Sequence, residues 1–140
     1  MKYFSKMYIH TTQITVRYGE TDQMGVVYYG NYALYYEQGR TEAMKHLGFS
    51  YREMEDNGII MPVIEMNCKY QKSAKYDDVL IIKTLLKELP SRKMTFFSEV
   101  YKDDVLINSG QVTLLFFNKK LNKVVSVPEN LLELLKPYFI

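Results

Sequence analysis

Cysteine and tryptophan are the residues that this sequence most lacks, with one Cys and no Trp among 140 residues. A single Cys excludes an internal disulfide and any metal site built from several thiolates. The two histidines, His10 and His46, are far apart in the chain and lack the spacing of metal ligands. We therefore expect neither a metal nor a redox cofactor.

Long hydrophobic runs and a strong excess of one charge are also missing. No apolar stretch approaches the roughly 20 residues that a membrane-spanning helix requires. The formal net charge of +2 is too small to indicate binding to nucleic acid or to a membrane surface. The first residues lack the apolar run of a signal peptide, so we expect a cytoplasmic location.

Tyrosine, in contrast, is abundant, with 13 residues in a chain that is 14% aromatic and 47% hydrophobic. A tyrosine side chain combines a large apolar ring with a polar tip, which suits half-wet pockets and interfaces. The length is typical of one domain, and we expect residues 1–140 to form a single domain with its own core.

The order of the expected elements predicts an α+β fold. Alternating and β-branched residues indicate strands at 9–18, 62–70, 79–89, 93–101, 105–118 and 124–127. Between the first two strands the pattern is helical, and Pro128 stands where a short final helix would begin. A long helix packed on one face of an antiparallel sheet is the simplest arrangement of this order.

The long helix is expected over residues 32–47. Aromatic and aliphatic residues from Tyr32 to Leu47 recur at spacings of three and four, which defines one buried face. Gly48 is placed to end the helix in the left-handed conformation. Gly39 in mid-helix costs roughly 1 kcal/mol relative to Ala, and close packing of the helix on the sheet is the expected compensation.

The turn that precedes this helix carries the clearest chemical signal. Asp22 lies in the stretch Thr-Asp-Gln-Met-Gly, which is good turn chemistry and needs no further explanation. A catalytic interpretation is also open, because a helix N-terminus offers unpaired N–H groups that stabilise an oxyanion. An acid on one side of a carbonyl and N–H donors on the other form a minimal site for acyl transfer.

A family resemblance rests on one cluster of residues. The cluster is Asp22, Gly25, Val26, Val27, Tyr28, Tyr29, Asn31 and Tyr32, followed by Glu37 and Arg40. This pattern resembles the signature of the 4-hydroxybenzoyl-CoA thioesterase and YbgC-type acyl-CoA thioesterases, which have the hotdog fold. The dense match covers residues 14–48, and the rest of the chain agrees in layout.

The resemblance implies roles for two residues. Asp22 matches the catalytic carboxylate of the family, which acts as a general base for water or as a nucleophile. The backbone N–H of Tyr29, at the helix start, would polarise the thioester carbonyl. Many YbgC-type relatives have His at this position, so the Tyr argues against a His-assisted mechanism here.

The resemblance also implies an acyl-CoA substrate, with coenzyme A as part of the substrate and no other cofactor. A homodimer or homotetramer is expected, with the site at the subunit interface. Glu37 and Arg40 are expected to form an i, i+3 salt bridge. The candidate substrate-binding residues are Gly25, Val27, Tyr28 and Asn31 near the helix start, and Arg92 and Lys93 for the CoA phosphates.

Two other functions stay open at the level of sequence. The first is hydrolysis of acyl carrier protein thioesters, and the second is a non-catalytic module that binds acyl-CoA. Catalysis by Cys68 is disfavoured, because a lone Cys within a strand usually serves as a small hydrophobic residue.

Overall fold

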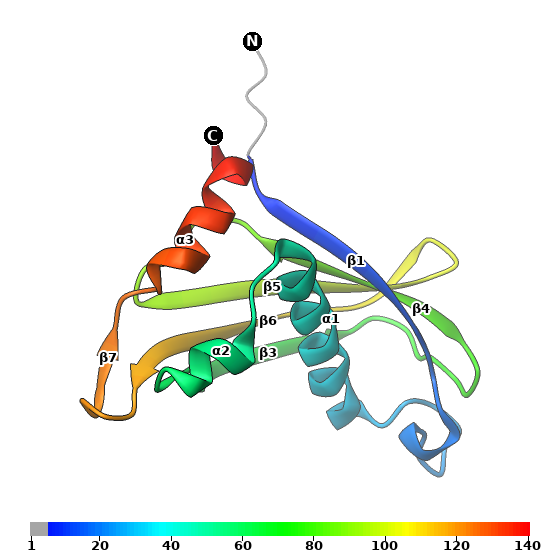
Figure 1. The fold of residues 1–140 in the computed structure, drawn as a ribbon. Helices are drawn as coiled ribbons and strands as arrows, with labels where there is room; N and C mark the ends of the chain where they lie inside the picture. The colour runs from blue at the N-terminus through cyan, green and yellow to red at the C-terminus, as the bar shows by residue number, and fades with distance from the viewer. Residues whose placement is uncertain (1–5) are drawn as a thin grey trace.

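The computed structural model describes residues 6–140. A curled antiparallel sheet wraps around the long helix α1 (Tyr32–Leu47), which lies across the concave face of the sheet (Figure 1). Two shorter helices, α2 (Tyr51–Asp56) and α3 (Glu129–Leu135), complete the domain. The expected α+β layout of one helix on an antiparallel sheet is therefore confirmed.

The main strands lie side by side in the order β1, β4, β5, β6 and β3, and every neighbouring pair is antiparallel. Two short strands pair with the end of β6. The bounds are β1 (Tyr8–Thr15), β2 (Ile59–Ile60), β3 (Val63–Tyr70), β4 (Val79–Leu86), β5 (Lys93–Lys102), β6 (Val105–Asn118) and β7 (Lys123–Val125). Single 3₁₀ turns lie at η1 (Tyr18–Glu20), η2 (Tyr29–Asn31) and η3 (Lys136–Phe139).

Helix α1 buries the face that its spacing predicts, and its close approach to the sheet depends on Gly39. A Cβ at Gly39 would lie 2.7 Å from both Ile82 Cγ2 and Thr84 Oγ1 on β4. This contact is the expected compensation for a helical glycine. The helix ends at Gly48, whose φ of 92° is in the left-handed region. The buried residues of α1 are Tyr32, Tyr35, Tyr36, Gly39, Ala43, Met44 and Leu47.

Several details differ from the sequence-based expectation: for example, the strand expected at 79–89 ends at Leu86, and the one expected at 124–127 spans Lys123–Val125. The first strand ends at Thr15 rather than at residue 18, because the chain then enters η1, where the Arg17 N–H donates to Glu20 Oε1 at 2.8 Å. The Glu37–Arg40 salt bridge is not among the ion pairs of residues 6–140. Helical spacing brings such residues onto neighbouring positions, but Glu37 is exposed whereas Arg40 is partly buried, and spacing alone does not oblige the two side chains to pair.

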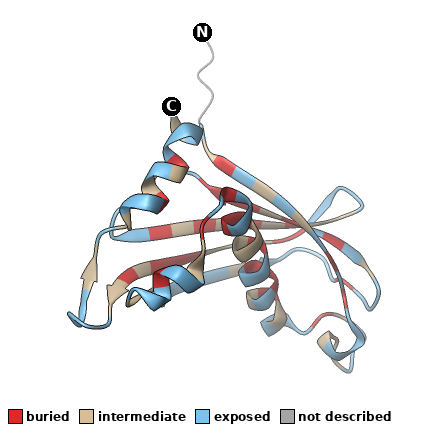
Figure 2. Cartoon of the chain, viewed as in Figure 1, coloured by how far each residue is buried: buried red, intermediate tan, exposed pale blue. Residues whose placement is uncertain are grey.

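Strand β3 forms an exposed edge of the sheet. Its residues are exposed on both faces except for Cys68, which is partly buried, and the strand stands out in pale blue in Figure 2. Within residues 6–140 it pairs only with β6. Such an edge leaves a row of backbone N–H and C=O groups without partners. In the same range, no helix has the length and apolar character needed to cross a membrane.

Candidate active site

The Asp22 loop is a closed turn that is fixed by its own backbone. Thr21 and Val27 form an isolated antiparallel bridge, and the Asp22 N–H donates to the Val26 carbonyl at 2.8 Å. The Gly25 N–H donates back to the Asp22 carbonyl at 3.0 Å, and Gly25 has a φ of 81°. A residue with a side chain rarely adopts this conformation, which explains the glycine at this position.

Only one oxygen of the Asp22 carboxylate accepts hydrogen bonds within the turn. Oδ1 accepts hydrogen bonds from the backbone N–H groups of Met24 at 2.8 Å and Val26 at 3.4 Å. Oδ2 has no hydrogen-bond partner among residues 6–140. The structural and the catalytic interpretations of Asp22 are therefore compatible, because one oxygen anchors the side chain while the other is available to a reactant.

The helix start lies beside this loop and is held by hydrogen bonds to Glu20. The Tyr28 N–H and the Asn31 side-chain amide both donate to the Glu20 carbonyl, at 2.9 and 2.8 Å. The Asn31 N–H donates to the Tyr28 carbonyl at 2.9 Å, which closes η2. Within the described residues no acceptor pairs with the N–H of Tyr29 or Gly30. These are the unpaired donors that a helix N-terminus provides.

Asp22, Val27 and Tyr29 line one cavity of about 240 Å³. The tyrosine rings of Tyr29, Tyr32 and Tyr70 form much of its wall, and Tyr70 meets each of the other two edge to face, with ring centroids 6.5 and 5.6 Å away. An acid, free backbone donors and an aromatic wall are thus gathered in one place. This arrangement suits attack on the carbonyl of a bound acyl group.

The other candidate binding residues lie around this cavity or far from it. Tyr28 and Asn31 line a second, more open hollow of about 670 Å³ that also contains Asp22. Arg92 lies just before β5, and Lys93 is the first residue of that strand. Both follow β4 in the chain. Strand β4 starts next to the Asp22 loop, since the Val16 N–H donates to Asp78. Its length puts Arg92 and Lys93 roughly 25 Å away, at the opposite end of the sheet.

The cavity residues from Tyr70 to Ser73 had no signal in the sequence. Tyr70 is the last residue of β3 and Lys72 follows it, and both line the cavity with Asp22. Neither lies in the segment around Asp22. The pairing of β3 with β6 and the hydrogen bond from the Val27 N–H to the Ala74 carbonyl bring them to the site. Lys72 adds a cation to the rim of the cavity.

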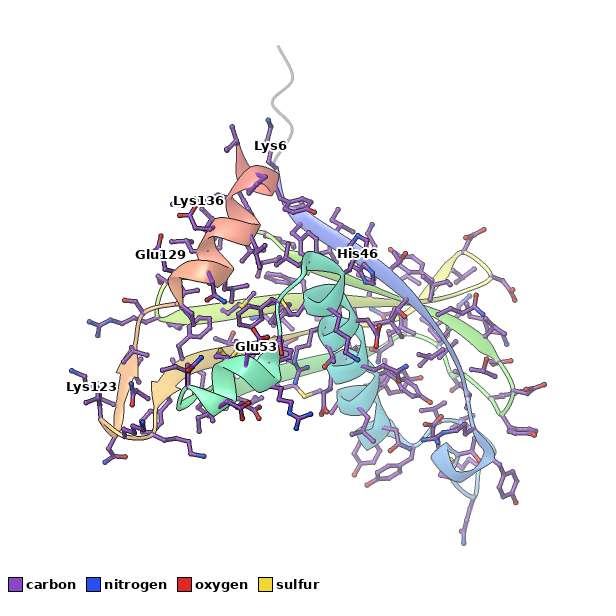
Figure 3. All side chains as sticks on the ribbon, viewed as in Figure 1. Lys6, His46, Glu53, Lys123, Glu129 and Lys136 are labelled. Carbon is purple, nitrogen blue, oxygen red and sulfur yellow. The ribbon has the colours of Figure 1, made fainter. Side chains whose placement is uncertain are left out.

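Cys68 has no histidine partner. Its Sγ lies 3.2 Å from the Tyr36 hydroxyl and 3.3 Å from the Asn108 amide nitrogen. The two histidines lie elsewhere: His10 on β1 stacks on His46 of α1 at a centroid distance of 4.9 Å, and His46 is labelled in Figure 3. Among the described residues no group of three or more His, Cys, Asp or Glu side chains could hold a metal ion.

Comparison with known proteins places this geometry in a family. A model of the Thioesterase-like superfamily matches residues 16–135. The chain is 38% identical over 95 residues to the Bacillus subtilis (strain 168) protein named "Putative acyl-CoA thioesterase YneP", which covers 68% of this chain and 69% of the relative. It is 27% identical over 119 residues to the acyl-CoA thioester hydrolase YbgC of Escherichia coli O157:H7, with 84% and 89% covered.

A solved structure agrees with this assignment. The DHNA-CoA thioesterase from Staphylococcus aureus superimposes with a TM-score of 0.81 at 34% identity, over 84% of this chain and 80% of that one. The fold and the site together define a thioester hydrolase with the hotdog fold. The chain belongs to the Thioesterase-like superfamily, and the resemblance recognised in its sequence is confirmed.

Proposed function

We propose that this protein hydrolyses acyl-CoA thioesters to a free acid and coenzyme A. The observation that carries the proposal is the cavity that is lined by both Asp22, whose Oδ2 makes no hydrogen bond among residues 6–140, and the helix-start residue Tyr29. The names of the relatives, which refer to acyl-CoA thioesterases, support the same substrate class. Membership of an enzyme family also favours hydrolysis over the non-catalytic binding module.

In the proposed mechanism the thioester carbonyl lies between Asp22 and the helix start. Asp22 either removes a proton from an attacking water or attacks the carbonyl carbon itself. The backbone N–H of Tyr29 donates to the oxygen as it becomes negative, and the free N–H of Gly30 lies next to it. The C–S bond then breaks, and the thiolate of coenzyme A takes up the proton that Asp22 removed or, in the nucleophilic route, a proton from water. In the nucleophilic route a water then hydrolyses the mixed anhydride and releases the acid. This chemistry requires no metal and no redox cofactor.

The substitution Asp22→Asn tests the proposal, because it keeps the acceptor for the Met24 N–H and removes the base or nucleophile. A general base contributes about 10²- to 10⁴-fold to a rate, so kcat should fall at least about a hundredfold. Release of free thiol from a panel of acyl-CoA and matched carrier-protein thioesters is the assay. Asp103→Asn, in the turn between β5 and β6, is the matched control. Near-normal turnover by Asp22→Asn would refute the assignment.

The two roles of Asp22 are separable by isotope. If Asp22 is a general base, a single turnover in ¹⁸O-water places the label in the product acid. A nucleophile first forms a mixed anhydride, and attack of water on the Asp22 carbonyl of this anhydride puts the label in the enzyme, so labelled Asp22 identifies the nucleophilic route. Mass spectrometry of the product and of the peptide that contains Asp22 reads the difference.

We further propose that a second copy of the chain pairs with the exposed edge of β3. Four apolar side chains of this strand, Val63, Ile64, Met66 and Tyr70, are 40–52% exposed, and its outer backbone groups are free to pair. A two-fold axis beside β3 would join the two sheets into one. The result is a homodimer, or the dimeric unit of a homotetramer.

Such a dimer would give Arg92 and Lys93 access to a site. Because antiparallel pairing of β3 with its copy reverses direction, the Lys93 end of one sheet would lie beside the Asp22 end of the other. We propose that Arg92 and Lys93 contact the CoA phosphates of the partner's site, while Gly25, Val27, Tyr28 and Asn31 shape the site in their own chain. The expected cytoplasmic location is part of the same proposal.

A further inference from the structure

The side chain of Tyr70 joins the exposed edge strand to the turn that carries the proposed oxyanion donor. Its hydroxyl donates a hydrogen bond to the Tyr29 carbonyl at 3.2 Å, across 41 positions of sequence. The Tyr29 carbonyl also accepts the N–H of Tyr32, which is an ordinary bond of the turn η2. The hydroxyl of Tyr70 therefore makes a tertiary hydrogen bond to the backbone of this turn.

The turn is also held at both ends by Glu20, whose carbonyl accepts the Tyr28 N–H and the Asn31 side-chain amide, but neither bond reaches the Tyr29 carbonyl. It is a single 3₁₀ turn of three residues, a conformation with poorer hydrogen-bond geometry than an α-helix. The Tyr29 side chain is 64% exposed, and its aromatic neighbours are Tyr28 and Tyr70. Burial does not fix Tyr29, and its carbonyl shares one planar peptide group with the Gly30 N–H. The hydrogen bond from Tyr70 to this carbonyl therefore helps to set the direction of the Gly30 N–H.

The hydroxyl of Tyr70 is protonated near neutral pH and can donate a hydrogen bond there. The neighbouring Cys68 thiol and, after it, burial raise the pKa of Tyr70 to about 12. The hydroxyl thus keeps its proton near neutral pH. The Tyr29 carbonyl, which can only accept, takes the hydrogen bond from it.

Resting on the function proposed above, we infer that Tyr70 is a positioning residue for hydrolysis: its hydroxyl holds the Tyr29 carbonyl, so that the Gly30 N–H of the same peptide group is aimed at the developing oxyanion beside the Tyr29 N–H. Tyr70 itself does not react. The interaction is realised in the transition state, where the oxygen becomes negative, and only weakly in the bound substrate. Its loss should therefore lower kcat and leave KM nearly unchanged.

The substitution Tyr70→Phe removes the hydroxyl and keeps the ring that lines the cavity. A threefold to tenfold fall in kcat is expected, with KM and the thermal midpoint of unfolding close to those of the wild type. Tyr101→Phe is the matched control, since its hydroxyl also makes a hydrogen bond, to Glu99 at 2.8 Å, but does not line the cavity. This control should hydrolyse at the wild-type rate.

A second variant separates positioning from packing. Introducing 4-aminophenylalanine at position 70 restores a donor at the same place and should recover most of the lost kcat, whereas 4-methoxyphenylalanine, which cannot donate, should not. Wild-type kcat in Tyr70→Phe, or a loss confined to the unfolding midpoint, would overturn the inference. If Asp22→Asn abolishes turnover in the same assay, the proposed function survives that result. If Asp22→Asn keeps near-normal turnover, the role of Asp22 is refuted, and a wild type that releases no thiol from any acyl-CoA of the panel would refute the proposed function.

Discussion

Removing the Tyr36 hydroxyl should destabilise the fold by an amount that the surrounding contacts set. Tyr36 and Asn108 are both fully buried between α1 and the sheet. The Tyr36 hydroxyl donates to Asn108 Oδ1, and it lies 3.2 Å from Cys68 Sγ. Burial, followed by the Cys68 contact, raises the pKa of Tyr36 far above its ordinary value, so the donor stays protonated.

In the variant Tyr36→Phe the Asn108 oxygen keeps only a weak contact with Cys68 Sγ at 3.7 Å. Leaving a buried acceptor without a proper donor costs about 1–3 kcal/mol. For a domain of this length, 1 kcal/mol shifts the thermal midpoint by about 4 °C. We expect the free energy of unfolding to fall by about 1–3 kcal/mol and the midpoint to fall by about 4–12 °C.

The measurement is urea denaturation at one fixed protein concentration, since association adds to apparent stability. Tyr18→Phe, on a ring that is 77% exposed, is the control and should change the free energy by less than about 0.5 kcal/mol. The double variant with Asn108→Leu should lose less than the sum of the single variants, because both polar partners are then absent. A loss below about 0.5 kcal/mol in Tyr36→Phe, or strict additivity, would refute the reasoning.

Two further outcomes are expected. If β3 pairs with a second copy, light scattering should give at least twice the chain mass, and Met66→Lys should reduce it; a monomeric wild type contradicts the proposal. Burial and His46 lower the pKa of His10 below its ordinary 6.5, against a smaller opposite effect of Glu42. The unfolded chain therefore binds more protons below about pH 6.5, and the free energy of unfolding should fall there with decreasing pH. His10→Gln should flatten this dependence in urea titrations at several pH values, and equal slopes would refute it.

The parts of the fold that could be predicted are those with local causes. The long helix begins at Tyr32 and ends at Gly48 as expected, because side-chain spacing and a left-handed glycine act within a few residues. The hairpin between β5 and β6 turns at Asp103 and Asp104, both of which have positive φ. The short strand β2 was not predicted, because it depends on pairing with the distant end of β6. The turn η1 was not predicted either, although its hydrogen bond between the Arg17 N–H and Glu20 is local.

The same division applies to the site. The sequence by itself determined that an acid would stand in a tight turn before a helix, since the spacing from Asp22 to Tyr29 is a property of one short segment. Only the tertiary structure decided that Tyr70 closes the cavity and donates to the Tyr29 carbonyl, and that Arg92 and Lys93 lie at the other end of the sheet. The physical reason is that strand order and register join residues far apart in the chain, and many orders are compatible with the same alternation of side chains.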